Sequence, residues 1–271
     1  MELVDSHVHL QDYGQGIDVS EVVSQAAEAG VATLVCNGTN ENDWWTVLDY
    51  AGKLPGVLPC LGLHPWFVSE RSSGWFSTLE ELVRTTNCGI GEIGLDRLYQ
   101  NIDRPLQEES FRLQLELARR YERPVMVHCV RAWGWLMDVL RSEDSIPQGM
   151  LIHSYGGSAD LIKPLAEMGA YFSFSGKALF EGHSQSRRSL AAVPIDRLLL
   201  ETDTPNMLPP ERFRAVSVLS SEGKELNHPA NLPAILSGIA DFLGQTPDEL
   251  SEILWQNAGR FFGPLKTHQE L

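Results

Sequence analysis

Short apolar runs alternate with longer amphipathic stretches along most of the chain. Each run is brief and either apolar or rich in β-branched residues, a pattern typical of strands buried on both faces. Eight such runs predict strands at 2–10, 31–39, 56–65, 88–96, 123–130, 149–157, 169–176 and 196–205.

The stretches between these runs carry the start and stop signals of helices. Helices are predicted at 18–30, 105–123, 158–170, about 230–243 and 247–262, with a polar loop at 206–228 before the last two. Gly30 suits the end of the first helix, while Pro105 suits the first turn of the second. Arg119 and Arg120 lie at its end, where the helix dipole favours positive charge. Pro164 is expected to kink the third helix or shorten its first turn.

Alternation of strands and helices indicates a parallel sheet, and eight repeats favour a closed (β/α)₈ TIM barrel. We expect one domain over residues 1–271, with the active site at the C-terminal ends of the strands. A doubly wound open sheet is the alternative fold. It would usually carry a glycine-rich phosphate turn after its first strand, and VDSHVHLQDYG (4–14) contains none.

Imidazoles and carboxylates recur where the predicted strands end. They are His7, His9, His64, Glu92, His128, His153 and Asp203. Strand alternation predicts His7 and His9 on one face of the first strand, opposite Val4 and Val8. A single histidine at such a position is more often a hydrogen-bonded structural group than a ligand. A whole group converging on one barrel mouth instead needs a cation, and this set of donors favours a divalent metal.

Charge and cysteine content narrow the possible functions. The chain has 21 Lys+Arg against 36 Asp+Glu, a formal net charge of −15, which disfavours broad binding to a phosphate backbone. The four cysteines form no C-x-x-C pair and are predicted to be reduced and buried. The first residues, MELVDSHVHL, contain neither a basic leader nor a long apolar stretch, so we expect no signal peptide and no membrane-spanning segment. We expect a cytoplasmic protein with no membrane partner and no obligate protein partner.

Seven short motifs spread over the chain in order carry a family resemblance. They are DSHVHL (5–10), GLHP (62–65), GEIGLD (91–96), PVMVH (124–128), HSYGGS (153–158), SFSG (173–176) and LLETDTP (199–205). With these motifs the chain resembles the TatD family of metal-dependent hydrolases, within the amidohydrolase-like barrels. The resemblance covers nearly the whole chain.

The resemblance implies two divalent metal ions, Zn, Mg or Mn, at the barrel mouth. It assigns one metal to His7, His9 and Asp203, a bridging position to Glu92, and the second metal to His128 and His153. Such a pair lowers the pKa of a shared water and polarises the bond to be cleaved. Asp203 and Glu92 are then the catalytic carboxylates, with Asp203 as general base.

Three further side chains are expected to support this site. Strand alternation places Asp5 on the face of His7, and Glu201 on the face of Asp203. Orienting a ligand imidazole is the expected task of both, with a structural ion pair as the alternative. His64 resembles the family's GLHP histidine, which lies close to the substrate phosphate.

The sequence departs from the family pattern at three places. Val130 stands where members often have arginine, HSYGGS replaces the common HCFTGS, and His228-Pro229 replaces a Glu-Pro pair. All three fall where substrate rather than metal is expected to be contacted. They therefore leave the substrate, and the role of His228, open.

The leading hypothesis is a TatD-type deoxyribonuclease that hydrolyses phosphodiesters from a DNA end in a 3′-5′ exonuclease-like manner. Trp66, Tyr99, Trp133 and Tyr155 are candidates to stack on bases, with ordinary rim packing as the alternative. The second hypothesis is hydrolysis of a small amide or ester, including D-aminoacyl-tRNA deacylation, because the same metal–water chemistry attacks a carbonyl carbon. A third, a binding protein with a structural metal, is disfavoured because structural sites usually have a closed coordination sphere.

Overall fold

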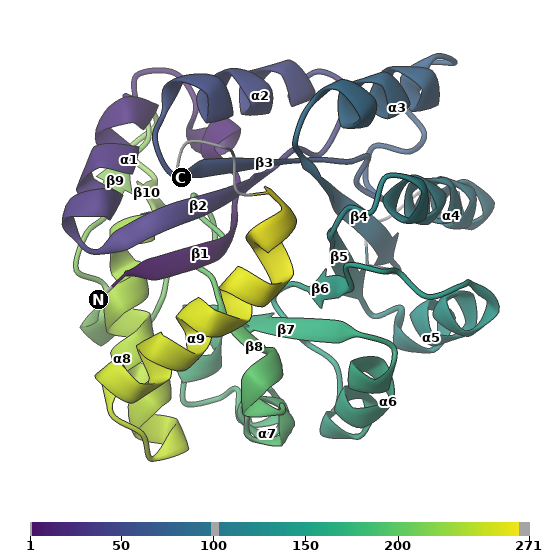
Figure 1. The fold of residues 1–271 in the computed structure, drawn as a ribbon. Helices are drawn as coiled ribbons and strands as arrows, with labels where there is room; N and C mark the ends of the chain where they lie inside the picture. Colours follow the sequence, from purple (N-terminus) through teal and green to yellow (C-terminus); the bar gives the residue numbers. More distant parts are fainter. Residues whose placement is uncertain (1, 99–102, 266–271) are drawn as a thin grey trace.

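A computed structural model describes residues 2–98 and 103–265, which form a nearly closed (β/α)₈ barrel (Figure 1). The strands are β1 (Leu3–Val8), β2 (Val31–Asn37), β3 (Val57–Leu61), β4 (Gly89–Asp96), β5 (Val125–Val130), β6 (Met150–Ile152), β7 (Ala170–Phe174) and β8 (Leu198–Leu200). They pair in parallel and in chain order from β1 to β8. Across the remaining seam, Ser6 Oγ donates to Leu200 O at 2.8 Å and Asp203 N to His7 O at 3.1 Å. The predicted barrel is thus confirmed, although β6 and β8 are much shorter than their apolar runs.

Helices surround the sheet in the predicted alternation. They are α1 (Val19–Glu28), α2 (Trp44–Lys53), α3 (Trp75–Thr85), α4 (Arg104–Arg120), α5 (Trp133–Ser142), α6 (Ile162–Glu167), α7 (Ser184–Ala192), α8 (Leu232–Leu243) and α9 (Pro247–Phe262). The Asp18 side chain caps α1 by accepting from Ser20 N at 2.9 Å. Pro164 shortens its helix, because a 3₁₀ turn at Ala159–Leu161 replaces the first part of the predicted span. None of the helices in residues 2–98 and 103–265 has the length and apolar character needed to cross a bilayer.

The segment predicted as a polar loop at 206–228 contains a small antiparallel hairpin. It consists of β9 (Val218–Leu219) and β10 (Glu225–Leu226). Ser220 N donates to Lys224 O at 2.9 Å, and Gly223 takes a φ of 75°, which glycine adopts without strain. The prediction of a polar loop did not include this hairpin, because its two strands, joined by the turn sequence SSEG, are too short to show periodicity.

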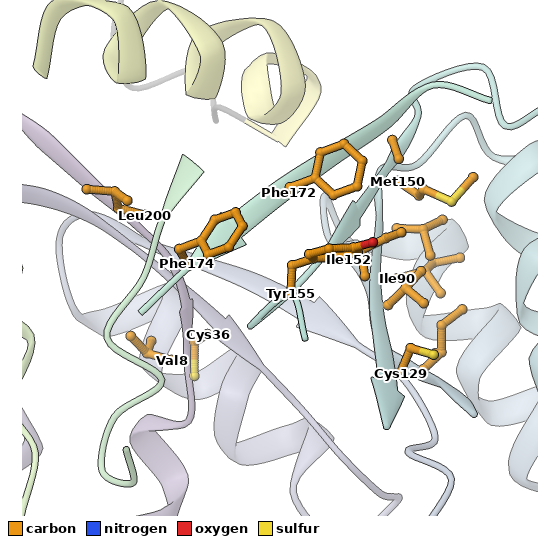
Figure 2. Packing of buried hydrophobic residues seen from close by; sticks show 14 of the residues in the cluster. Val8, Cys36, Ile90, Cys129, Met150, Ile152, Tyr155, Phe172, Phe174 and Leu200 are labelled. Carbon is orange, nitrogen blue, oxygen red and sulfur yellow. The ribbon is translucent and has the colours of Figure 1, made fainter. Parts of the chain in front are cut away.

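Two apolar clusters pack on opposite sides of the barrel wall. The outer cluster lies between sheet and helices and includes the side chains shown in Figure 2. The inner cluster fills the barrel from within and consists of Val35, Leu58, Cys60, Met126, Leu151, Tyr171, Leu199, Ala258, Phe261, Phe262 and Leu265. Its last four members belong to α9 and the short 3₁₀ turn that follows it. Figure 1 shows α9 lying across one end of the barrel, so this cluster closes that end.

The strand residues of the inner cluster determine which side chains lie at the other end. Side chains two positions apart on a strand share a face. Met126, Leu151 and Leu199 lie in the inner cluster, and the polar residues two positions further along are His128, His153 and Glu201. The barrel interior is therefore apolar at the end covered by α9 and polar at the C-terminal ends of its strands.

Candidate metal centre

Irregular pairing in β1 and β4 redirects the side chains that enter the centre. Between Asp5 and Val8, β1 advances three residues while β2 advances two, and β4 does the same against β5 between Ile90 and Ile93. Such bulges re-aim side chains and are common beside active sites. Val4 packs against the inner cluster whereas Val8 belongs to the outer one. The predicted sharing of one face by Val4 and Val8 is therefore wrong, because the bulge shifts the alternation.

Glu92 lies at the middle of the candidate centre and also at the middle of β4, not at its end as predicted. Its Oε2 is 3.3 Å from His7 Nε2 and 3.2 Å from His9 Nε2. Its Oε1 is 2.9 Å from His128 Nδ1 and 2.8 Å from His153 Nε2. The two carboxylate oxygens therefore face two different pairs of imidazoles.

Asp203 enters from the turn that follows β8. Its backbone has a φ of 54°, the left-handed region, which costs a non-glycine residue free energy and is frequent at functional sites. Its Oδ1 lies 3.7 Å from His9 Nε2. Ligand atoms of Asp203, His7 and His153 all lie within 4.8 Å of one another. Asp203 thus closes the centre on the side of β8.

Two of the imidazoles are held from behind by groups that the sequence analysis did not single out. His9 Nδ1 lies 2.8 Å from Asn37 O at the end of β2, and His128 Nε2 lies 2.9 Å from Asp96 Oδ2. Trp66 Nε1 also donates to Asp96 Oδ2, at 2.8 Å. Such contacts fix the orientation of each ring and the nitrogen that it presents. Asp96 is the last residue of the GEIGLD motif and of β4, and this position at a strand end could have identified it as a residue of the site.

Glu201 and Asp5 take different positions around the centre. Glu201 Oε1 lies 3.7 Å from His153 Nδ1, and its other oxygen accepts from Ser173 Oγ. Asp5 instead accepts from Thr202 N at 2.9 Å and from the Thr202 hydroxyl. The predicted placement of Asp5 on the imidazole face is corrected: its carboxylate ties β1 to the residue before Asp203.

His64 lies among the candidate ligands. Its Nε2 is 3.4 Å from Glu92 Oε1, and its ring meets that of His128 edge to face at 4.4 Å between centroids. Its Nδ1 accepts from Trp66 N at 3.2 Å. Ligand atoms of His64, Glu92 and His128 form one group within 4.8 Å, and those of His7, His9 and Glu92 form another.

The electrostatics of the cluster favour added positive charge. Burial alone would raise the pKa of the Glu92 carboxyl, but His153 and His64 outweigh burial and hold this pKa well below its usual range. Burial raises the pKa of Asp203 to about 7, despite the opposing influence of His153 and His9. Burial would lower the pKa of His9, yet its contacts with Glu92 raise it to about 9. Buried carboxylates and imidazoles with these preferences suit a divalent cation.

The aromatic residues expected at the rim differ in how far they are exposed to solvent. The Trp66 ring is 42% exposed beside His64. Tyr155 is only 2% exposed and belongs to the outer cluster (Figure 2). Its hydroxyl donates to Ser158 O at 2.8 Å, and its ring centroid lies 4.9 Å from that of Trp133. Stacking of a base on Tyr155 was therefore a wrong prediction, because the ring belongs to the core. Tyr99, also proposed for stacking, lies outside the described residues.

Two departures from the family pattern sit at strand and turn ends. Val130 is half-buried at the end of β5, where its carbonyl accepts from Arg97 N at 3.0 Å. His228 is fully buried and its Nδ1 accepts from Ala230 N at 3.0 Å, capping the 3₁₀ turn Pro229–Asn231. Burial lowers the pKa of the His228 imidazole to about 4. His228 therefore stabilises a turn, and no contact in the described chain links it to Glu92.

The profile of a family described as "TatD related DNase" matches residues 4–263. A protein of Pantoea vagans named "3'-5' ssDNA/RNA exonuclease TatD" is 33% identical over 266 residues, covering 96% of this chain and 99% of that protein. The "Uncharacterized metal-dependent hydrolase YcfH" of Escherichia coli (strain K12) is 31% identical over 270 residues, covering 97% and 96%. The crystal structure of YJJV, a TatD homologue from E. coli K12, has a TM-score of 0.87 at 25% identity, covering 96% of this chain and 98% of that one. The barrel, the convergent histidines and carboxylates and these similarities agree, and the chain belongs to the TatD family of metal-dependent hydrolases.

Proposed function

We propose that this protein is a divalent-metal-dependent phosphodiesterase that removes nucleotides from the 3′ end of single-stranded DNA, with the whole chain acting as one domain. The observation that carries the proposal is the arrangement around Glu92. One of its oxygens faces His7 and His9, while the other faces His128 and His153. A carboxylate in this position is suited to bridge two ions.

The residues fit such a pair of ions. His7, His9 and Asp203 would hold the first, His128 and His153 the second, and Glu92 both. When bound there, two divalent ions would supply an activated water and stabilisation of the negative charge on the phosphoryl oxygen.

The protein's own side chains then hold and move protons. Asp203 accepts the proton released by the attacking water, as a general base near the reacting atoms. Asp96 holds the ring of His128 from behind, so that the opposite nitrogen faces the centre, and Glu201 places its charge 3.7 Å from His153 Nδ1. His64 presents its Nε2 beside Glu92, where it can contact a phosphoryl oxygen.

Several features support a nucleic-acid end as the substrate. Relatives of 31–33% identity include proteins named as 3′-5′ exonucleases of single-stranded DNA and RNA. The exposed Trp66 ring lies beside His64 and offers a face for one base. The net charge of −15 suits contact with a few nucleotides better than contact with a long strand.

A direct test measures bound metal and compares two substrates. Metal content is determined by mass spectrometry, and the metal-loaded protein is assayed on 3′-ended single-stranded DNA and on D-aminoacyl-tRNA. Nucleotide release should be abolished by chelator and reduced at least about a thousandfold by Asp203→Asn. Asp138→Asn, an exposed aspartate on α5, is the matched control and should keep full activity.

Two results would contradict the proposal. Hydrolysis of the tRNA ester without nucleotide release would replace the phosphodiester with a carbonyl ester as the substrate. Failure to bind any divalent metal would remove both functions.

A further inference from the structure

A cavity of about 450 Å³ opens beside the candidate metal centre, between the ends of β6 and β7 and the start of α7. Ser154 and Tyr155 line it and directly follow His153 in the chain. Tyr155 N donates to Ser173 O at 3.0 Å, so this wall is fixed to β7 as well as β6. The cavity is therefore built on the ends of β6 and β7, and the first of these strands leads directly into His153.

The lining of this cavity is cationic. Lys177 and Arg188 line it together with His183, and no carboxylate is among its described lining residues. Another cavity, of about 610 Å³ beside α4, also holds arginines but is lined by glutamates, and Glu108 pairs with Arg112 at 2.9 Å. In a chain of net charge −15, a cavity whose described lining has cations and no carboxylate favours the approach of a polyanion.

The floor of the cavity is apolar and rigid. Tyr155 and Phe174 are among its lining residues, and each is at most 2% exposed as part of the outer cluster (Figure 2). The Tyr155 hydroxyl is held by Ser158 O. A rigid wall beside two cations suits a backbone phosphate, because phosphate contacts fix the position of a strand.

We propose that this cavity binds the phosphate of the nucleotide next to the bond that is cleaved. The inference rests on the proposed phosphodiesterase function and deepens it: the substrate is a strand with at least one further phosphate. Lys177 and Arg188 neutralise that phosphate. Discrimination between a strand and a minimal phosphodiester then depends on this cavity.

The test compares a single-stranded pentanucleotide with bis(p-nitrophenyl) phosphate, which has one phosphodiester and no flanking phosphate. The double variant Lys177→Met/Arg188→Gln is measured against wild type. The ratio of kcat/KM for the two substrates should fall at least about tenfold, mainly through KM for the pentanucleotide. The slope of log KM against log salt should become shallower by about one.

A matched control removes the same charges at other places. Lys163→Met on α6 and Arg141→Gln at the end of α5 replace exposed cations that do not line the cavity. Their substrate ratio and salt dependence should equal those of wild type. An equal loss in the control would show that net charge, and not the cavity, recognises the strand, and would overturn the inference.

The remaining outcomes separate this inference from the proposed function. An unchanged ratio and salt slope in the double variant would overturn the cavity as a phosphate site while leaving phosphodiester hydrolysis intact. If the wild-type protein cleaves neither substrate, the proposed function fails. Fluorescence anisotropy of a labelled oligothymidylate then tests strand binding by the cavity without requiring cleavage. Weaker, less salt-dependent binding by the double variant supports it, and equal binding or no binding by wild type overturns it.

Discussion

The two ends of the barrel interior are built from the same strands but differ in what holds them together. At the end covered by α9, Met126, Leu151 and Leu199 pack against Phe261 and Phe262. Two residues further along the same strands the interior changes to His128, His153 and Glu201. At the apolar end, burial lowers the free energy of the folded state and needs no specific partner for each group. The polar end lowers its free energy only when each buried donor and acceptor has a partner.

This difference explains where the backbone is regular. The strand residues of the inner cluster follow the alternation of a regular strand. At the mouth, bulges in β1 and β4 and a left-handed Asp203 depart from it. The packing of the apolar end thus stabilises the fold. This stability compensates for the irregular backbone at the mouth, which holds side chains in positions that a regular strand does not provide.

The largest effect is expected from Glu92→Gln at the mouth. The amide keeps the size of the side chain but removes the charge that faces both pairs of imidazoles. Activity on single-stranded DNA should fall by about a thousandfold or more, and bound metal should drop below half of the wild-type amount. Activity assays and mass spectrometry of the purified variant measure both. Glu28→Gln, an exposed glutamate on α1, serves as control, and wild-type activity in Glu92→Gln would refute the bridging role.

Phe261→Ala tests the apolar end. The ring is 1% exposed and packs on Tyr171 and Phe262 at 5.0 and 4.7 Å between centroids. Its loss should lower the free energy of unfolding by about 3–5 kcal/mol in urea denaturation. Phe242→Ala on α8, where the ring is 40% exposed, should cost much less. If the folded Phe261→Ala protein lost activity as severely as Glu92→Gln, the separation between the two ends would be wrong.

The sequence predicted the apolar end and the order of elements well. Hydrophobic periodicity responds to burial, so the eight runs, the five helices and the barrel followed from it. Pro164 shortened its helix as expected. The strands β6 and β8 were predicted too long, because the polar segments after Ile152 and Leu200 are still largely buried although their backbone is no longer a strand.

The mouth was predicted only in part. The convergence of the histidines and carboxylates followed from their places on the strands. The bulge in β1 did not, because one extra residue leaves no mark on composition, and Asp5 was consequently placed on the wrong face. Asn37 acts through its backbone carbonyl, which no side-chain pattern reveals. Partners that depend on backbone direction are therefore the part of a site that sequence reasoning misses.

A third prediction concerns pH, because His228 is a fully buried imidazole at the turn before α8. The folded-state pKa of His228 is about 4, below the value of about 6.5 in an unfolded chain. As pH falls, the unfolded chain takes up the proton first, so this contribution to stability is complete above about pH 6.5 and is lost towards pH 4. Wild type should therefore lose about 2 kcal/mol more than His228→Asn between roughly pH 7.5 and pH 5.

Urea denaturation of both proteins at several pH values measures this difference. Asparagine can also cap the turn at Pro229–Asn231, so the variant tests the titration and not the cap. His183→Asn, where the imidazole is half-buried at the start of α7, is the control and should follow wild type. Parallel stability curves for wild type and His228→Asn would show that this imidazole is not protonated on unfolding.

The smallest effect is expected from Cys60→Ala, which asks whether the apolar end contains any chemistry. Cys60 is fully buried in the inner cluster, 4.0 Å from Met126 Sδ, and burial raises the pKa of its thiol well above the ordinary value. A thiol in this environment is unreactive and acts as a small apolar side chain. The variant should lose only about 1 kcal/mol of unfolding free energy and keep wild-type activity. In native wild-type protein, Cys60 should resist thiol reagents until urea is added. Rapid labelling of Cys60 in the native protein would instead show that the end covered by α9 opens. It would contradict the view that this end only stabilises the fold while the polar end carries the chemistry.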